Sequence, residues 1–263
     1  MLSPRTPWQV TRAVWHALFM REALARTTSN RMAWFWMLLE PIALVAMMVG
    51  IRSVISSGQH NIGGVHFIPW LICGLFSFFL FRENMIRSIG AVSAYKGLFS
   101  YRQVKPIDPV FIRCYLEGML KSFIFMLFII VGLLLEIDLF PAEPLEALFV
   151  WLLLWMLGLG AGLTLSVLSD LVPEIGKIIN LTSMPLILIS SVMIPLNYLP
   201  HQIQRYLILN PIVHGVESLR VCFFDSYRAI NGISIVYLSI WALGLVSLGL
   251  LLHLRFAVRL KAQ

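Results

Sequence analysis

The chain has 263 residues, a formal net charge of +7 and a composition unlike that of soluble proteins. Hydrophobic residues make up 59% and charged residues 13%, against about 45–50% and about 25% in an ordinary globular domain. A soluble core of this size could not bury so much apolar surface, so the natural solvent of this chain is a bilayer. A spanning helix needs about 20 mostly apolar residues, and several of them exclude a large soluble domain.

The sequence predicts an all-α polytopic membrane protein with six transmembrane helices, because exposed backbone cannot stay unpaired in lipid. The second apolar stretch is short unless it continues past Arg82 towards residue 89. We expect one permease domain over 1–263, with a cytoplasmic amphipathic N-terminal part over 1–32, a six-span region over 33–254 and a tail over 255–263. The apolar stretches cover residues 34–55, 66–81, 110–135, 148–168, 178–199 and 233–254.

The basic residues predict the orientation, because Lys and Arg gather on the cytoplasmic side of membrane proteins. With both termini inside, sixteen of the twenty Lys and Arg residues are cytoplasmic. The outer connection over 136–147 then has four acidic residues and no basic one. In the outer segment over 195–232, prolines at three positions favour broken or re-entrant helices before the last span.

The N-terminal residues 8–31 predict a helix lying on the inner membrane surface. Trp8, Trp15 and Phe19 fall near one face of that helix, as in interfacial helices. The alternative is a plain basic flank of the first span.

Between the second and third spans, aromatic and apolar residues recur at helical spacing. Tyr95, Leu98, Phe99 and Arg102 stand at i, i+3, i+4 and i+7 of a predicted three-turn cytoplasmic helix, which the prolines that follow would end. Burial against the protein's own spans or the lipid surface is one explanation of this stripe. The other is docking into a groove of a cytoplasmic partner.

The sequence has no motif for ATP binding or for hydrolytic catalysis. It lacks G-x-x-x-x-G-K-[ST], G-x-S-x-G and H-E-x-x-H. We therefore expect no catalytic residue, metal site or cofactor in this chain. What remains are ionisable residues near membrane depth, each a functional candidate because charge in lipid is costly. The candidates for a substrate path are Glu40, Arg52, Arg82, Arg87, His214, Glu217 and Arg220.

Structural alternatives exist for several of these residues. Glu40 could pair with a neighbouring helix, and Arg52 could extend its charge to the outer interface. His214, Glu217 and Arg220 share one face of a predicted helix after Asn210 and Pro211. They could close the outer end of a pathway or anchor a re-entrant turn.

Two further groups have a simpler structural interpretation. Arg113, Glu117 and Lys121 stand at i, i+4 and i+8, which predicts a self-neutralising ladder on the third span. The tryptophans mostly fall near predicted interfaces, as in an aromatic belt, with stacking of Trp36 and Trp70 on sugar rings as the alternative.

Four stretches resemble the membrane subunit of ABC-type exporters of capsular polysaccharide, the KpsM-type permeases of Gram-negative bacteria. With length and hydropathy, the resemblance covers nearly the whole chain, and the stretch at 95–108 is the most specific. The stretches are Leu38 to Val45 (LLEPIALV), Tyr95 to Asp108 (YKGLFSYRQVKPID), Val172 to Lys177 (VPEIGK) and Leu209 to Arg220 (LNPIVHGVESLR).

The resemblance implies an inner-membrane homodimer that works with two cytoplasmic ATPase subunits, in which ATP and Mg²⁺ bind. Periplasmic and outer-membrane partners would carry a lipid-linked, usually acidic polysaccharide onward, and no nucleic acid is involved. The basic cytoplasmic side would raise the local concentration of such a polymer. The residues that would contact the ATPase are Tyr95, Lys96, Leu98, Phe99, Tyr101, Arg102 and Lys105.

Other functions stay open at this point. A related branch of the family exports O-antigen or teichoic acid. A polytopic enzyme acting on lipid-linked glycans would turn over without an ATPase. An ion-coupled secondary transporter would depend on a proton or sodium gradient, with Glu40 as the carrier.

Overall fold

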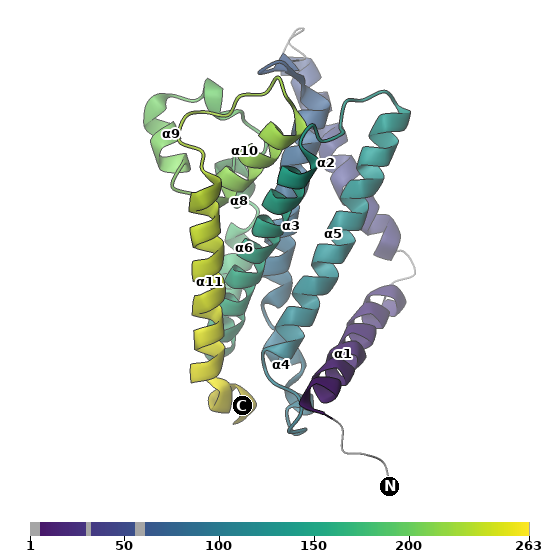
Figure 1. Ribbon diagram of the computed structural model, residues 1–263, viewed down its shortest axis with the longest axis vertical. Helices are drawn as coiled ribbons and strands as arrows, with labels where there is room; N and C mark the ends of the chain where they lie inside the picture. Colours follow the sequence, from purple (N-terminus) through teal and green to yellow (C-terminus); the bar gives the residue numbers. More distant parts are fainter. Residues whose placement is uncertain (1–5, 30–32, 56–60, 263) are drawn as a thin grey trace.

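The computed structural model describes residues 6–29, 33–55 and 61–262, which form a bundle of α-helices (Figure 1). A hairpin of β1 (Asn61–Ile62) and β2 (Val65–His66) turns through Gly63 and Gly64, both at positive φ, as tight two-residue hairpins require. The helices are α1 (Pro7–Ser29), α2 (Ala33–Ile55), α3 (Phe67–Ser88), α4 (Ala91–Ala94), α5 (Asp108–Leu134), α6 (Pro144–Leu171), α7 (Pro173–Thr182), α8 (Leu186–Ile189), α9 (His201–Leu207), α10 (Pro211–Phe223), α11 (Ile235–Arg255) and α12 (Ala257–Ala262), with 3₁₀ turns η1 (Lys96–Leu98) and η2 (Leu196–Tyr198).

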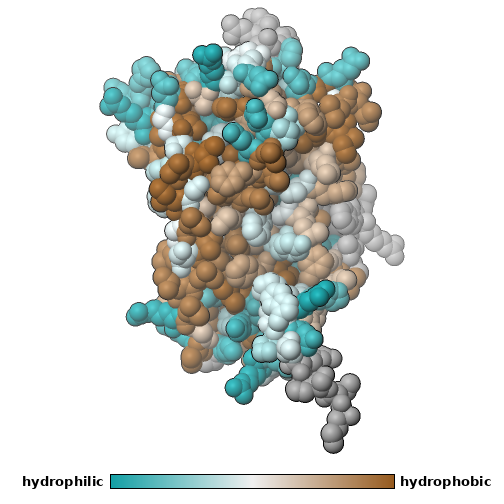
Figure 2. Space-filling model, viewed as in Figure 1, coloured by the Kyte–Doolittle hydropathy of each residue, from teal (hydrophilic) through white to brown (hydrophobic). Residues whose placement is uncertain are grey.

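Among the described residues, α3, α5, α6 and α11 are long and apolar enough to cross a membrane. They correspond to the second, third, fourth and sixth predicted spans. Helix α3 continues through Arg82 to Ser88, which gives the second span its full length. Helix α2 covers the first predicted span, with an apolar stretch over Leu38–Ile51. Figure 2 shows an apolar band between two hydrophilic ends on the face it presents.

The fifth predicted span, over 178–199, is not one helix, so the expectation of six continuous helices is wrong there. Helix α7 ends at Thr182, and α8 is only four residues long. Pro185 lacks the N–H that would continue α7, and Ser191 has φ +58°, which ends α8. The chain then continues as η2, α9 and α10, so the outer segment consists of broken helices as its prolines predict.

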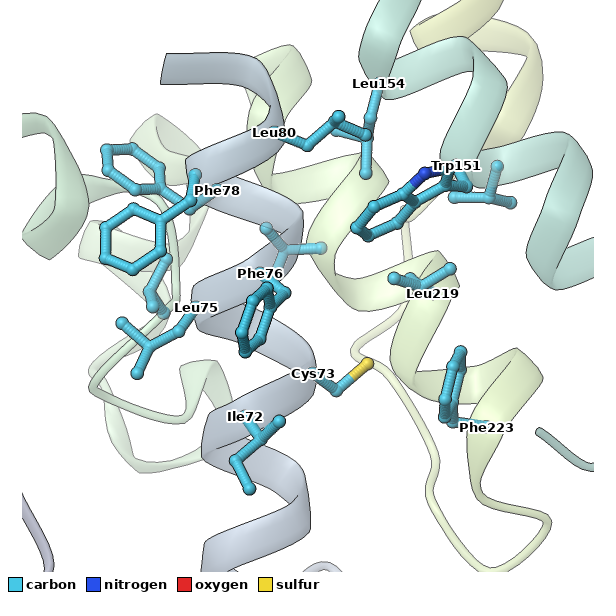
Figure 3. Close-up of a cluster of buried hydrophobic side chains, with 14 of the residues drawn as sticks. Ile72, Cys73, Leu75, Phe76, Phe78, Leu80, Trp151, Leu154, Leu219 and Phe223 are labelled. Atoms are coloured by element: carbon cyan, nitrogen blue, oxygen red, sulfur yellow. The ribbon is translucent and has the colours of Figure 1, made fainter. Parts of the chain in front are cut away.

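Helix α3 lies at the centre of the bundle, packed against α5, α6 and α10. Its inward side chains are buried, and Figure 3 shows those around Phe76 meeting residues of α6 and α10. Aromatic rings join the four helices: Phe125 of α5 stacks on Phe76 at 5.1 Å and on Trp151 at 4.9 Å between ring centroids, and Phe223 lies 5.5 Å away. Such pairs add about 0.5–1.5 kcal/mol each beyond area burial.

The connections gather at the two ends of the bundle as the predicted topology requires. At one end, the N–H of Glu143 donates to the carbonyl of Cys222 at 2.9 Å, and Ser226 lies against Gly64. We call this the α9 end (Figure 1). At the other, the α4 end, a second apolar cluster joins α1, the 91–107 segment and Leu260 of α12.

Helices α6 and α11 pack together over most of their length. At Gly160, a Cβ atom would lie 2.6 Å from the backbone nitrogen of Val246 and 2.8 Å from the carbonyl carbon of Leu245. Only glycine permits this approach of the two backbones, which is how helices without a hydrophobic driving force gain contact in lipid.

We predict that Gly160→Ala lowers the unfolding free energy by about 1–3 kcal/mol, because the added methyl group forces α6 and α11 apart. The measurement is thermal unfolding of the purified protein in detergent. Gly244→Ala on α11 is the control, since no atom lies within 4 Å of its Cβ position. Equal melting temperatures for the two variants would show that the close approach does not support the bundle.

Candidate functional site at the two ends of the bundle

The segment over 91–107, at the α4 end, is not the three-turn helix that the spacing predicts. It consists of α4, the 3₁₀ turn η1 and a series of turns that lead into α5. Gly97 and Ser100 interrupt the helix, because the Ser100 hydroxyl donates to the Gly97 carbonyl at 3.1 Å and competes with helical bonding. The carboxylate of Asp108 then accepts the N–H of Lys105 at 2.8 Å, which begins α5.

Two members of the aromatic stripe face the interior of the chain. Tyr95 and Phe99 are 5% and 6% exposed within the cluster at the α4 end. The hydroxyl of Tyr95 donates to Glu22 of α1 at 2.6 Å. Burial, and then this hydrogen bond, raise the pKa of Tyr95 to about 12. The first explanation of the stripe, burial against the protein's own helices, therefore holds for these two rings.

The other predicted coupling residues form the outward side of the segment. Tyr101 is 65% exposed, and Arg102 and Lys105 are also exposed. Leu98 is half-buried. The ammonium of Lys96 lies 3.3 Å from the carboxylate of Asp170 on α6. We call residues 95–105 the α4-end loop.

Asp170 and Glu22 connect this loop to the long helices. The sequence predicts Glu22 only as an i,i+4 partner of Arg26, which lies 3.9 Å away, and Asp170 was not predicted as a site residue. The carboxylate of Asp170 also accepts a hydrogen bond from the Ser93 hydroxyl at 2.7 Å. The side chain of Asp170 is only 2% exposed. The signal for Asp170 in the sequence was its place directly after the apolar stretch over 148–168, on the same side of the membrane as the basic connection between the second and third spans. Together with Asp108, Asp170 and Glu22 attach the segment to α6, α1 and α5.

A cluster of charges joins α1, α3 and α5 next to this loop. The carboxylate of Glu117, with its side chain 3% exposed, lies 2.6 Å from Arg26 and 3.2 Å from Arg87. Glu83 lies 2.6 Å from Arg82 and 3.6 Å from Arg87. The two path candidates Arg82 and Arg87 are thus paired with acidic side chains. Arg82 is largely buried, whereas the side chain of Arg87 is 57% exposed.

The predicted ladder on α5 is wrong, because its three residues turn to other helices. Arg113 pairs with Glu22 at 3.1 Å, and Glu117 with the two arginines named above. The ammonium of Lys121 lies 5.4 Å from the centre of the Phe79 ring. Pairs between helices are favoured here because a buried carboxylate gains more from two guanidinium groups than from one neighbour on its own helix.

Helix α1 lies along α5, so part of its apolar face contacts protein. The indole N–H of Trp15 donates to Asp108 at 2.9 Å, and its ring stacks on Phe111. Phe19 packs against Tyr115, and Trp8 is 69% exposed. The helix predicted over 8–31 is confirmed as α1, with α5 as its partner.

The opposite end is organised around Arg220 of α10, which has no exposed surface. Its guanidinium donates to the carbonyl of Ser191 at 2.8 Å, of Val192 at 3.0 Å and of Trp70 at 3.3 Å. It lies 2.8 Å from the carboxylate of Glu217 and 3.5 Å above the ring of Trp70. We call this group of residues the Arg220 cluster.

Glu217 is satisfied within the same cluster. Its carboxylate accepts the hydroxyl groups of Ser191 at 2.7 Å and Tyr227 at 2.8 Å, in addition to Arg220. A substrate cannot reach either charge without opening the core. Of the two alternatives for this helix face, the structure favours the anchor. Trp70 is fully buried and cannot stack on a sugar ring.

His214 has a separate structural role on α10. Its Nε2 lies 2.7 Å from the carbonyl of Ile208, and its Nδ1 accepts the N–H of Ser234 at 2.9 Å. One nitrogen therefore donates and the other accepts, which requires the neutral ring. Burial lowers the pKa of His214, in agreement with that state. His214 thus holds together the two chain segments that flank α10.

Glu40 and Arg52 both lie on α2. The carboxylate of Glu40 is exposed on the surface of the chain, so the alternative of a partner on a neighbouring helix does not hold within the described residues. The side chain of Arg52 lies outside the described residues. In the part of the chain that the structure describes, no three His, Cys, Asp or Glu side chains come together to hold a metal ion.

We predict that Arg220→Met lowers the unfolding free energy by about 3–5 kcal/mol, because it leaves the carboxylate of Glu217 buried without its cation. Adding Glu217→Gln to that variant should recover part of the loss, since the uncompensated charge is removed. Thermal unfolding in detergent measures both, with exposed Arg255→Met as the control. If the single and the double variant have the same melting temperature, the charges of Arg220 and Glu217 are not coupled.

The chain is similar in sequence to known proteins. The ABC-2 type transporter family matches residues 13–224, from α1 to the end of α10. The polysialic acid transport protein KpsM of Escherichia coli is 34% identical over 253 residues, which cover 95% of each chain. The capsule polysaccharide export inner-membrane proteins CtrC of Neisseria meningitidis serogroup A and BexB of Haemophilus influenzae are 29% and 27% identical, over 94% of this chain and 92% of each relative. The resemblance to KpsM-type permeases is thereby confirmed, and the chain belongs to the ABC-2 type transporter family.

Proposed function

We propose that this chain is the inner-membrane permease of an ABC-type exporter that moves lipid-linked, acidic capsular polysaccharide out of the cytoplasm. The observation that carries the proposal is the similarity, over more than nine-tenths of the chain, to three permeases named for polysialic acid transport or capsule polysaccharide export. The chain lacks a phosphate-binding loop. ATP and Mg²⁺ therefore bind in two partner ATPase subunits, and periplasmic and outer-membrane partners receive the polymer.

The α4-end loop is the surface that contacts the ATPase. Its exposed side offers one large aromatic ring, Tyr101, flanked by the cations Arg102 and Lys105. Its inward side is fixed by Tyr95 and Phe99. An aromatic anchor with charged neighbours is typical of interface hot spots.

Hydrogen bonds and an ion pair on the inward side of this loop would transmit a movement of the loop to the spans. The loop and the neighbouring α4 are attached to α6 through Asp170, to α1 through Glu22 and to α5 through Asp108. Closure of the ATPase subunits on ATP would bind one arrangement of these helices better than the other, and only such a difference in affinity shifts the equilibrium.

A second copy of the chain completes the permease, and the exposed face of α2 supports this. Trp36, Glu40, Ala43 and Met47 recur at i, i+4, i+7 and i+11, and all are exposed on the single chain. A carboxylate facing lipid in the middle of a span costs several kcal/mol. The face therefore borders a partner copy or a water-filled path between two copies, where Glu40 meets solvent or substrate.

The charge of the α4 end suits an acidic polymer. By the predicted topology this end is cytoplasmic, and Arg87 is paired but more than half exposed there. A surface of one charge raises the local concentration of an oppositely charged substrate. Arg82 pairs with Glu83, the carboxylate that also lies near Arg87. Arg82 therefore positions Glu83 and Arg87 and does not contact the polymer itself.

We predict that Tyr101→Asp abolishes export while the protein stays folded in the membrane, because it places a charge on the aromatic anchor of the ATPase contact. Surface polysaccharide is measured by immunostaining, and co-purification of the ATPase reports the contact. Phe140→Asp is the matched control, since Phe140 is an aromatic residue 55% exposed at the α9 end.

Normal export with Tyr101→Asp would contradict the assignment of this loop. Phe99→Asp does not suit the test, because Phe99 is buried and a charge there would unfold the loop itself.

A further inference from the structure

A cleft of about 670 Å³ lies at the α9 end, between α9 and the connection that follows α10. Its volume falls within the range of about 300–1,000 Å³ typical of ligand pockets. The side chains on its walls are mostly polar or cationic. These polar and cationic side chains are Asn197, His201, Gln204, Arg205, Arg228 and Asn231.

The two arginines make this cleft cationic. By the predicted topology only Arg52, Arg205, Arg220 and Arg228 lie on the outer side, and Arg220 is enclosed in its cluster. Arg205 and Arg228 are both exposed, and neither pairs with a carboxylate within the described residues. A second, smaller cleft at this end, of about 380 Å³, is lined by Asp138 and Asp225 instead. An anion is therefore attracted to the first cleft and repelled by the second.

The remaining polar groups of the cleft match hydroxyl groups. The side-chain amide nitrogen of Gln204 donates to the carbonyls of Leu196 and Leu199, so its oxygen lies against Nδ1 of His201 at 3.2 Å. An amide oxygen only accepts, so Nδ1 carries a proton, and Nε2 is the second polar atom of the ring. The amides of Asn197 and Asn231 can both donate and accept.

The walls of the cleft are held in place before any ligand arrives. Gln204 fixes η2 against α9 through its two hydrogen bonds. His214 fixes Ile208 on one side and Ser234, three residues beyond Asn231, on the other. A site with fixed walls binds with a smaller loss of conformational entropy.

We propose that this cleft binds a carboxylate-bearing sugar residue of the exported polymer at the outer face of the membrane. The planar guanidinium groups of Arg205 and Arg228 bind the carboxylate, for which their paired donors are suited. His201, Asn197 and Asn231 bind the hydroxyl groups. The inference rests on the proposed function and names the class of sugar that this site selects. An anionic lipid headgroup offers the same combination of charge and hydroxyl groups, so the test separates the two sources.

The test uses the full chain in bilayer discs of zwitterionic lipid, with a fluorescent reporter beside the cleft. The three native cysteines are buried, so a dye attached through Gln202→Cys on α9 labels one exposed position. Gln103→Cys, at the opposite end, is the matched reporter for binding to the basic α4 end. The probes are tetragalacturonic acid and its neutral counterpart, maltotetraose.

We expect tetragalacturonic acid, but not maltotetraose, to change the signal of the Gln202 reporter. Arg205→Gln with Arg228→Gln should weaken this response at least tenfold and leave the Gln103 reporter unchanged. Equal responses to both probes, or an affinity that survives the double substitution, would overturn the proposal. In a further experiment, phosphatidylglycerol is included in the disc and no sugar is added. A signal change of the Gln202 reporter that depends on both arginines under these conditions would also overturn the proposal, in favour of a lipid headgroup.

This binding test and the test of export can fail separately. If the cell exports polymer normally through the protein but the reporter shows no binding, only the cleft proposal fails. If the cleft binds the acidic probe but removal of the protein leaves the surface polysaccharide unchanged, the proposed function fails instead.

Discussion

The guanidinium of Arg220 is enclosed on every side, and the fold at the α9 end depends on satisfying it. An unpaired buried charge destabilises a protein by several kcal/mol, so every donor needs an acceptor. Glu217 supplies the countercharge, and the carbonyls of Ser191 and Val192 supply further acceptors. Those carbonyls are available because the helix breaks after α8. The break in the fifth predicted span and the buried arginine therefore require each other. Gly74 of α3 provides the space for this guanidinium, because a Cβ atom at that position would overlap the Arg220 side chain.

The α4 end uses charge differently. Its ion pairs join helices that are far apart in the sequence, α1 with α5 through Arg26 and Glu117, and α3 with α5 through Arg87. The acidic partners are nearly buried, and among the cations only Arg87 is more than half exposed, so breaking these pairs would leave a buried carboxylate uncompensated. Ion pairs that link α1, α3 and α5 at the α4 end suit a permease that is driven from the cytoplasmic side. The apolar packing of α3, α6 and α11 connects the two ends.

Much of this architecture could be predicted from the sequence, because lipid imposes a simple rule on length and hydropathy. Five predicted spans correspond to helices, and the grouping of the connections at two ends follows from the same pattern. The helix after Asn210 was also predictable, since Asn210 accepts the N–H of Ile212 and Pro211 opens the helix. The family followed from four short motifs.

The errors have a common physical cause, which is that side-chain partners come from distant parts of the chain. The resemblance placed Tyr95 among the residues that would contact the ATPase, but its ring is buried and its hydroxyl donates to Glu22 of α1. The spacing on α5 suggested pairing along that helix, but guanidinium groups from α1 and α3 reach Glu117. In the fifth span, hydropathy alone did not distinguish a continuous helix from one interrupted to provide carbonyls for Arg220.

The central claim is that this chain exports a surface polysaccharide, and removing its gene from the host tests that claim most directly. The polymer is then located by staining whole and permeabilised cells. The account predicts polymer in the cytoplasm and a bare cell surface, restored by the gene in trans. An unchanged surface polysaccharide would contradict it, as would the absence of polymer from every compartment in cells whose synthesis enzymes are active.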